Sequence, residues 1–534
     1  MASPPPKSPE QTEKSKKYDR QLRLWGDHGQ VLLENAKVCL INATTLGAEI
    51  LKSLILPGIG AFTIVDGETV TEEDTGSNFF LDYDSVGMPR ARVATQSLLE
   101  LNADVHGDYI DETPEHILSH TQNFFNKFNI VIGTSLPEKV LIPLSKHLWE
   151  ANVPLIVCRS IGFLGYIRLQ VKEHTVIEAH PDNENPDLRL INPWPELKVH
   201  LEKTDISKLD NKERSHVPAL TILYYFIKKF QEHNNGALPR SRSDKDEIRK
   251  MIQESAVCDE NGVQILEDNF QEAIHLVNIG INPQIIPTQL KKILEDDCCT
   301  HLTQDSSPFW IMCAGLRELV QAEESLPVRG TLPDMASDSG SYIALQQIYQ
   351  KKALSQSEFV YRRVCQIVTD LGIQQDIISE QEVKLFCKHC SELYVMRGSC
   401  IADEYEKNSP DLSVYLEDPD SLMFSYVVLR GLERFLGEYN VYPGHLDDQV
   451  EPDVLKLKII TGKLLSEWRC TQILRDERVH EVCRYGGAEL HSVSAVLGGI
   501  AAHEAIKLLT HQYKPLNNTF IYDAITSSSA TYTL

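Results

Sequence analysis

The stretch that decides the fold is 38-VCLINATTLGAEI-50, in which an apolar run, a short polar turn and a helical pattern follow one another. This order predicts a strand, a turn and a helix, the unit that opens many nucleotide sites. In a G-x-G-x-x-G turn, glycines let backbone N–H groups approach phosphate at the helix N-terminus. The matching positions here are Asn42, Thr44 and Gly47. Because side chains at the first two positions would occupy the phosphate space, we expect an intact scaffold and a closed site.

The residues after this unit continue the alternation of strand and helix. Residues 61–70, "AFTIVDGETV", read as a second strand with Asp66 and Glu68 at its end. Apolar runs predict further strands at 129–135 and 153–171, the latter as one or two strands, and helical patterns predict helices at 91–102 and 141–152. A crossover helix makes consecutive strands parallel, so the sequence predicts a doubly wound α/β sheet covered by helices.

After about Val171 the pattern becomes mostly helical, with few strand-like runs such as 455–465, "LKLKIITGKLL". Residues 491–510 and 518–534 then read as one more helix and strand of the opening domain. The expected fold is therefore a discontinuous doubly wound α/β domain with a large, mostly helical insertion. The expected boundaries are a disordered tail at 1–17, the α/β domain at 18–170 and 485–534, and the insertion at 171–484.

Composition narrows the class of partner and compartment. The chain has 534 residues and a formal net charge of -24, which disfavours broad contact with nucleic acid or anionic lipid. No run reaches the roughly 18 apolar residues of a membrane span, and the Pro-, Ser- and Lys-rich start is not a secretory signal. Twelve scattered cysteines suggest reduced thiols. We expect a cytoplasmic or nuclear protein without a transmembrane segment or nucleic-acid partner.

Three motifs carry a resemblance to a known family. They are "YDRQLRLWG" at 18–26, "NPWPEL" at 192–197 and "ELHSVSAVLGGIAAHEAIKLL" at 489–509, followed by "PLNNTFIYD" at 515–523. Together with the degenerate turn they resemble the Rossmann-like, ThiF-type adenylation fold of ubiquitin-activating enzymes, over all of the chain beyond the tail. The length and the helical insertion resemble the non-catalytic subunit of a heterodimeric member.

The resemblance implies three partners. A catalytic subunit would bind ATP and Mg²⁺, adenylate the C-terminus of a ubiquitin-like modifier and capture it as a thioester, and a conjugating enzyme would then receive it. This chain would help to shape the thioester cleft through its insertion. It would bind no cofactor of its own, and we expect it to be inactive alone.

The family's ATP-binding positions are altered in this chain. The Asn-x-x-Arg-Gln-Phe stretch of active members becomes 74–79, "DTGSNF", so that Ser77 replaces the triphosphate-binding arginine. Arg90 stands where the family has lysine, and Ser135 lies near its magnesium-binding aspartate. Asp66 and Glu68 match ribose-binding positions, but we interpret them as inherited strand-end residues. One arginine without a metal ligand cannot stabilise a triphosphate in this chemistry.

The same resemblance implies that Arg20 reaches in trans into the ATP site of the partner, with Tyr18 and Gln21 as partner contacts. A guanidinium supplied in this way can stabilise phosphate charge without nucleotide binding by its own chain. The alternative is that Arg20 caps or pairs with its own helix. The irregular segment 325–342, with Leu332, Met335 and Tyr342, reads as a second partner-contacting region.

Several reactive side chains have a simpler interpretation. "CCTH" at 298–301 and "RCTQ" at 469–472 lack the proline that precedes the thioester cysteine of active members, so we expect structural cysteines. Cys387 and Cys390 have no second cysteine pair, and Cys400 alone does not complete a zinc site. His503 and Glu504 are expected on a solvated or interface face of the closing helix.

Two other functions stay open from the residues alone. The chain could be a self-sufficient nucleotide-binding α/β enzyme with an unusual turn, although several glycine and charge positions are lost together. It could also be a pure scaffold that contributes nothing to catalysis.

Overall fold

The computed structural model describes residues 16–121, 123–181, 186–258, 264–282, 285–405, 411–471 and 474–534. The chain forms two compact units: the first ends at Val176 and resumes over Val395–Leu534, and the second is Ile177–Tyr394. Most of the predicted tail lies outside the described residues. At its end, Lys17 Nζ donates to Asn102 at 2.6 Å and pairs with Asp104 at 2.8 Å.

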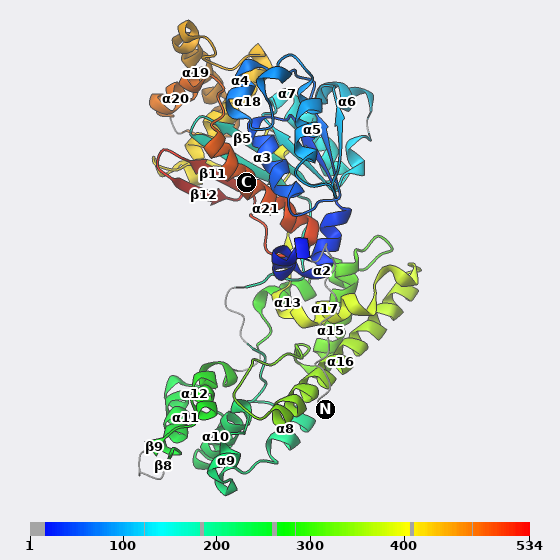
Figure 1. Ribbon diagram of the computed structural model, residues 1–534, viewed down its shortest axis with the longest axis vertical. Coiled ribbons are helices and arrows are strands. Elements are labelled where there is room, and N and C mark those ends of the chain that lie inside the picture. The colour runs from blue at the N-terminus through cyan, green and yellow to red at the C-terminus, as the bar shows by residue number, and fades with distance from the viewer. Residues whose placement is uncertain are drawn as a thin grey trace, which may run out of the picture. The chain divides into compact units, whose positions relative to one another are not determined.

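The first unit, in which Figure 1 labels β5, β11 and β12, is built on an eight-stranded sheet in the order β12-β11-β6-β5-β4-β1-β2-β3. Strands β3, β2, β1, β4 and β5 are parallel, whereas β6, β11 and β12 are antiparallel to their neighbours. The strands are β1 (Lys37–Ile41), β2 (Ala61–Val65), β3 (His106–Ile110), β4 (Ile130–Thr134), β5 (Leu155–Ile161), β6 (Leu164–Gln170), β11 (Thr519–Asp523) and β12 (Ser528–Tyr532).

This topology confirms the α/β class and the discontinuous domain. Strand β1 pairs with β2 on one side and β4 on the other, so the chain reverses its direction of winding at β1. Open sheets of this kind bind ligands outside the carboxyl ends of the two strands at such a switch point. The predicted run 153–171 forms the two strands β5 and β6, joined at Gly162 with φ 53°. The closing segment supplies two strands, β11 and β12, rather than one.

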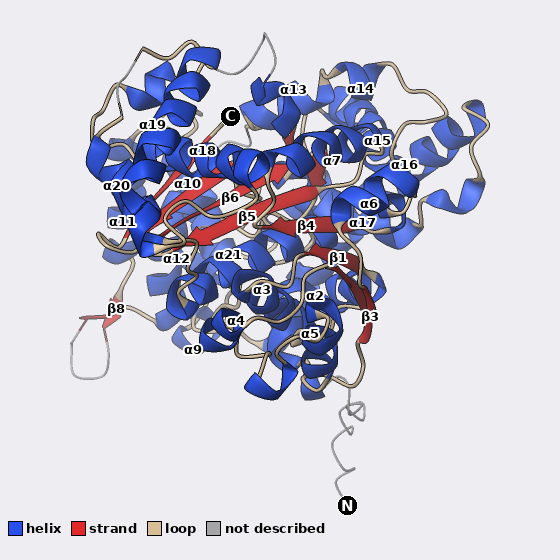
Figure 2. Cartoon of the chain, turned by 90° about the horizontal axis from the view of Figure 1, so that it is seen from above, coloured by secondary structure: helices blue, strands red, loops and turns tan. Residues whose placement is uncertain are grey.

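Helices cover both faces of the sheet. Figure 2 shows α3, α5 and α21 on one side of the strands and α7 and α18 on the other. The helices of this unit are α2 (Asp19–Asn35), α3 (Thr45–Ile55), α4 (Glu72–Ser77), α5 (Arg90–Leu99), α6 (Pro114–His120), α7 (Glu138–Glu150), α18 (Met423–Tyr439), α19 (Val450–Glu467), α20 (Asp476–Tyr485) and α21 (His491–Thr510).

Helix α21 packs closely against α3. A Cβ on Gly498 would lie 2.8 Å from Glu49 Cβ and 3.2 Å from the Glu49 carbonyl carbon, whereas one on Gly499 would meet no atom within 4 Å. Helix α21, with 20 residues, is long enough and apolar enough to cross a membrane. However, 61% of its most apolar 18-residue stretch is buried inside the protein. That burial is typical of a core helix.

Residues 395–484 differ from the sequence expectation, which assigned them to the insertion. Helices α18, α19 and α20 belong to the first unit. The run 455–465 is helical within α19, so its interpretation as strand-like is wrong. Leu457, Ile460 and Leu464 are buried at helical spacing, while Leu455 and Ile459 are 65% and 59% exposed. Three- and four-residue spacing therefore decides the structure of this run.

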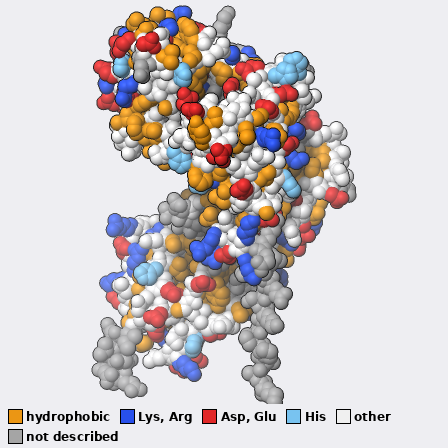
Figure 3. All heavy atoms as spheres, turned by 45° about the horizontal axis from the view of Figure 1, so that its top comes forward, with side chains coloured by type: hydrophobic (Ala, Val, Ile, Leu, Met, Phe, Trp, Pro, Cys, Tyr) orange, Lys and Arg blue, Asp and Glu red, His pale blue; other side chains and the backbone are white. Residues whose placement is uncertain are grey.

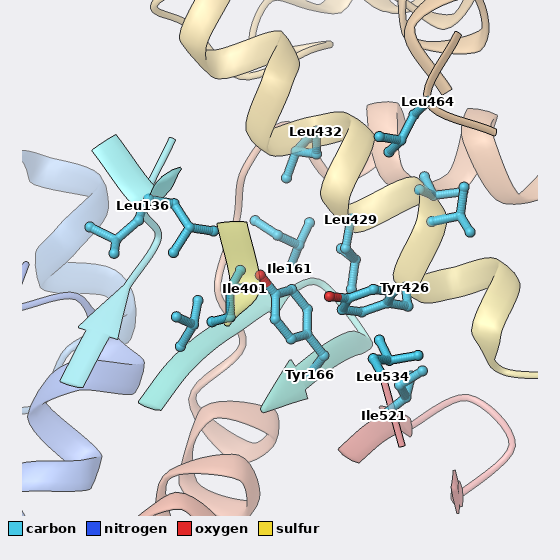
Figure 4. Packing of buried hydrophobic residues seen from close by; sticks show 14 of the residues in the cluster. Leu136, Ile161, Tyr166, Ile401, Tyr426, Leu429, Leu432, Leu464, Ile521 and Leu534 are labelled. Atoms are coloured by element: carbon cyan, nitrogen blue, oxygen red, sulfur yellow. The ribbon is translucent and has the colours of Figure 1, made fainter. Parts of the chain in front are cut away.

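Buried charges hold α18 against the sheet. Arg159 Nε of β5 donates to Glu433 of α18 at 3.2 Å. Arg168 Nε of β6 donates at 3.0 Å to Glu404, which precedes α18 in the chain and accepts from the Tyr426 hydroxyl of that helix at 2.9 Å. The ring centroids of Tyr166 and Tyr426 lie 5.1 Å apart, edge to face, among aliphatic side chains (Figure 4). Since a buried charge is tolerated only with a partner, these pairs specify how α18 docks on the sheet.

The second unit is mostly helical, and its core lies around α10, α12 and α16. Leu332 and Met335, predicted as partner contacts, are half-buried against this core. Its elements are α8 (Pro195–Leu201), α9 (Asn211–Arg214), α10 (Ala219–His233), α11 (Arg242–Glu254), α12 (Asp268–Gly280), α13 (Thr288–Leu294), α14 (Asp297–Thr300), α15 (Pro308–Glu323), α16 (Ser339–Asp370), α17 (Glu380–His389) and the short strands β8 (Val257–Cys258) and β9 (Gln264–Ile265). A further strand pair, β7 (His174–Val176) and β10 (Tyr394–Met396), belongs to the first unit except for Tyr394.

The surface carries charges of both signs. On the face in Figure 3, basic and acidic side chains are interspersed. The excess of negative charge is therefore not gathered into one broad patch on that face.

Candidate functional site

The turn after β1 lies at the switch point of the sheet and is closed by its own side chains. Asn42 has φ 67°, and its Nδ2 donates to the carbonyl oxygen of Thr134, at the end of β4, at 2.9 Å. The N–H of Asn42 donates to Val65 O at 2.9 Å. The side-chain amide of Asn42 therefore bridges the ends of β1 and β4, between which a nucleotide phosphate would have to enter.

Helix α3 starts with a capped and tightly packed turn. Thr44 is the N-cap, and its Oγ1 accepts the N–H of Gly47 at 3.3 Å. A Cβ on Gly47 would lie 2.6 Å from Asn42 O. The absence of a side chain at Gly47 therefore allows the helix to pack against the end of the preceding strand.

Arg90 is held by two carboxylates. Its Nε donates to Asp66 Oδ2 at 2.7 Å, its second terminal nitrogen to Asp66 Oδ1 at 3.2 Å, and its first to Asp74 at 3.4 Å. Burial alone would lower the pKa of the Arg90 guanidinium, but Asp66, with Asp74 and Glu68, raises it above its ordinary value. The charge of Arg90 is therefore already neutralised within the chain.

Asp66 has a structural role that the sequence interpretation did not include. Its side chain is fully buried, and besides Arg90 it accepts the N–H groups of Ala43 at 2.8 Å and Glu68 at 3.0 Å. Asp66 lies directly after β2, as expected, and is in addition the central acceptor of the turn. A group so enclosed cannot contact a ribose.

A cleft of about 650 Å³ lies over this turn. The predicted degenerate positions Thr44, Ser77, Arg90 and Ser135 all line it, so the structure brings them together. Ser77 Oγ lies 2.8 Å from Thr45 Oγ1, and Ser135 has φ 51°.

Sequence reasoning missed a further residue of this cleft, Glu489. Its Oε2 accepts the N–H of Leu46 at 3.1 Å, in the first turn of α3. The two residues are 443 positions apart, and no local pattern links them. Only its place at the start of a quoted motif, "ELHSVS", singles out Glu489 in the sequence.

Arg20 lies apart from this cleft, near the start of α2. Its side chain is exposed and forms no hydrogen bond or ion pair with any residue in the described part of the chain. Asp19, one residue before it, pairs with Arg23 at 2.9 Å. The alternative in which Arg20 pairs with its own helix is therefore not what the structure shows. Gln21 is half-buried.

Tyr18, predicted as a partner contact, is only 2% exposed. Its hydroxyl accepts from Asn102 Nδ2 at 3.0 Å and donates to Asp104 at 3.3 Å. The prediction for Tyr18 is wrong, because its side chain anchors the start of α2 within its own unit.

The remaining candidates have structural environments. Cys298 is exposed, whereas Cys299 and Cys470 are buried. Burial raises the pKa of the Cys390 thiol to about 12 and that of Cys387 well above its usual value, which disfavours the thiolate. Within the described ranges, no three His, Cys, Asp or Glu side chains are grouped as a metal site requires.

Two candidates on helices differ in exposure. His503 is exposed, but Glu504 is 5% exposed and accepts the N–H of Leu516 at 2.8 Å, so its expected solvated position is wrong. Tyr342, in the first turn of α16, is half-buried.

Comparison with known proteins identifies the family of the chain. The ThiF family matches residues 18–534, which places the chain in that family. The chain is 47% identical over 528 residues to the NEDD8-activating enzyme E1 regulatory subunit of Danio rerio, covering 98% of this chain and 99% of the relative. It is 46% identical over 541 residues to the subunit of the same name in Drosophila melanogaster, covering all of both chains. The chain therefore belongs to the family of NEDD8-activating enzyme E1 regulatory subunits.

A solved structure of E. coli MccB also matches, with a TM-score of 0.28 and 18% identity, over 38% of this chain and 57% of MccB. A likeness of this extent carries no argument about function.

Proposed function

We propose that this chain is the regulatory subunit of a heterodimeric activating enzyme for a ubiquitin-like modifier of the NEDD8 type. A separate catalytic subunit would bind ATP and Mg²⁺, adenylate the modifier, form the thioester and pass the modifier to a conjugating enzyme. The end-to-end similarity to regulatory subunits from a fish and an insect supports this assignment.

The observation that carries the proposal is the state of the cleft at the switch point. Asn42 bridges β1 and β4, and Arg90 is bound by Asp66 and Asp74. Phosphoryl chemistry needs cations that are free to meet the developing charge, usually with a metal ion. We infer that this chain does not adenylate the modifier alone and that it binds no ATP of its own.

Arg20 supports a direct contribution to the partner. Arg20 is exposed and has no partner among the described residues, so in that part of the chain nothing takes up its capacity to donate hydrogen bonds to an anion. We infer that Arg20 donates to phosphate in the ATP site of the catalytic subunit, where such a donor stabilises the transition state. Gln21, on the next position, remains a proposed partner contact.

The test of the assignment is ATP–pyrophosphate exchange that depends on the modifier. It is measured for this chain alone, for the catalytic subunit alone and for the two mixed. We expect exchange in the mixture and none from this chain. Exchange by this chain alone would show that its cleft is open and would support the self-sufficient enzyme instead.

Arg20→Ala then separates a catalytic contribution from a pure scaffold. Loss of one transition-state donor costs about 10²–10³ in rate, so we expect a decrease of that order in the mixture. Arg23→Ala is the matched control, because Arg23 lies on the same helix, is exposed and pairs with Asp19. Heterodimer formation is checked for each variant by size-exclusion chromatography. Unchanged exchange with Arg20→Ala would leave the scaffold as the better explanation.

A further inference from the structure

The start of α3 is shaped to hold negative charge. The first N–H groups of a helix have no partner within the helix and carry the positive end of its dipole. Two oxygens of this chain accept N–H groups in the first turn of α3, and a third accepts the N–H of Ala43, the residue before the N-cap. Asp66 Oδ2 accepts from Ala43 at 2.8 Å, Glu489 Oε2 from Leu46 at 3.1 Å and Thr44 Oγ1 from Gly47 at 3.3 Å.

Glu489 is delivered to this turn by a rigid connection between α20 and α21. Gly486 and Gly487 have φ of 58° and 88°, and a Cβ on Gly487 would lie 2.5 Å from the Tyr442 ring. The N–H of Gly162 donates to Ala488 O at 2.8 Å, and Gly162 forms a parallel bridge with Glu489. The backbone before Glu489 is therefore anchored to the strand pair β5 and β6, and the carboxylate is held in place.

The position is costly for an ordinary carboxylate. Glu489 Oε1 is buried and has no hydrogen-bond partner among the described residues. Burial raises the pKa of Glu489, whereas the N–H of Leu46 and the hydroxyls of Thr45 and Thr44 oppose that rise. A glutamate that gained nothing from the helix would turn towards solvent, as Glu73 does on the rim of the same cleft.

We propose that the Glu489 carboxylate is a built-in anion that occupies the start of α3 and keeps phosphate-bearing ligands out of the cleft. The inference rests on the proposed function, in which this chain binds no ATP. It supplies a reason for that lack of binding beyond the loss of the glycines. Asp66 neutralises Arg90, and Glu489 occupies the helix N-terminus. Both attractions that a phosphate would find are thereby satisfied within the chain.

The test is the gain of an anion site in the full chain on removal of this carboxylate. Binding of inorganic pyrophosphate is measured by isothermal titration calorimetry at constant ionic strength, with sodium chloride as the exchanged salt. We expect Glu489→Ala to bind pyrophosphate at least tenfold more tightly than the unmodified chain. Glu489→Gln keeps the acceptor oxygen but loses the charge, so its affinity is expected between the two.

Glu73→Ala is the matched control, because it removes one negative charge from the same cleft without touching α3. An equal gain in Glu73→Ala and Glu489→Ala would overturn the inference, since net charge alone would explain it. A folded Glu489→Ala chain with no gain would also overturn it, because the side chains of Asn42 and Thr44 would then suffice to close the cleft. Circular dichroism establishes that each variant is folded.

If Glu489→Ala does not fold, Glu489→Gln is compared with Glu73→Ala in its place. Tighter pyrophosphate binding by Glu489→Gln would support the inference, and an equal gain or no gain would overturn it. The outcome is separate from that of the proposed function. The exchange assay with unmodified subunits tests the proposed function without any Glu489 variant, and either result there leaves the pyrophosphate comparison interpretable.

Discussion

Arg90→Ala tests whether this arginine is a structural group or a remnant of a phosphate site. Asp66 is fully buried, and Arg90 is its cationic partner, with donor–acceptor distances of 2.7 and 3.2 Å. Removal of one member of a buried ion pair costs about 3–5 kcal/mol, because the other charge is left uncompensated. Asp66 would keep two backbone N–H donors, from Ala43 and Glu68, so we expect the lower end, about 3 kcal/mol.

The assay is urea denaturation of the full chain, followed through the transition of the first unit. Arg92→Ala is the control, since Arg92 is exposed on the same helix and its loss should change the free energy of unfolding by about 0.5 kcal/mol or less. The double variant Asp66→Asn with Arg90→Leu removes both charges and should recover much of the loss. A loss below about 1 kcal/mol for Arg90→Ala would refute the structural role inferred for the pair.

Two further measurements test the core of the first unit. Gly498→Ala places a methyl group 2.8 Å from Glu49 Cβ and should lower the free energy of unfolding by about 1–3 kcal/mol. The methyl group of Gly499→Ala meets no atom within 4 Å, so this variant should raise the free energy of unfolding by up to about 1 kcal/mol. Equal effects of the two variants in thermal denaturation would contradict this packing. Burial, with the nearby His511, lowers the pKa of His174 to about 3, so the unfolded chain binds the extra proton as pH falls below about 6.5. The stability contributed by neutral His174 is therefore present above that pH and is lost towards pH 3, with a loss of about 2 kcal/mol at pH 5. In urea titrations at several pH values, the free energy of unfolding of His174→Phe should depend less on pH than that of the unmodified chain. Parallel curves for the two chains would contradict this role of His174.

The alternation of strand and helix could be predicted from the sequence because it depends on neighbouring residues. Apolar runs such as 129–135 and the helical pattern of 491–510 correspond to β4 and α21. The altered turn was also visible, since Asn42 and Thr44 stand where glycines would be needed. The sequence does not distinguish the two adjacent glycines of α21, whereas in the structure only Gly498 closely approaches Glu49 of α3.

The division of the helical region could not be predicted in the same way. The spacing of apolar residues indicates that residues 423–485 are largely helical, but it does not indicate which surface the apolar faces of these helices contact. Docking of α18 on the sheet depends on pairs such as Arg159 with Glu433, which are 274 positions apart. Tyr18 was misassigned for the same reason, because its partners Asn102 and Asp104 are distant in the sequence.

By itself the sequence determined the α/β scaffold, the loss of the glycine turn and the family, since each depends on residue types at short spacing. Only the tertiary structure decided what the altered site contains. Arg90 pairs with Asp66, and Glu489 reaches the start of α3 from the far end of the chain. The physical reason is that a buried charge or a helix terminus takes whichever partner the fold places within hydrogen-bond distance, and that choice has no local signature.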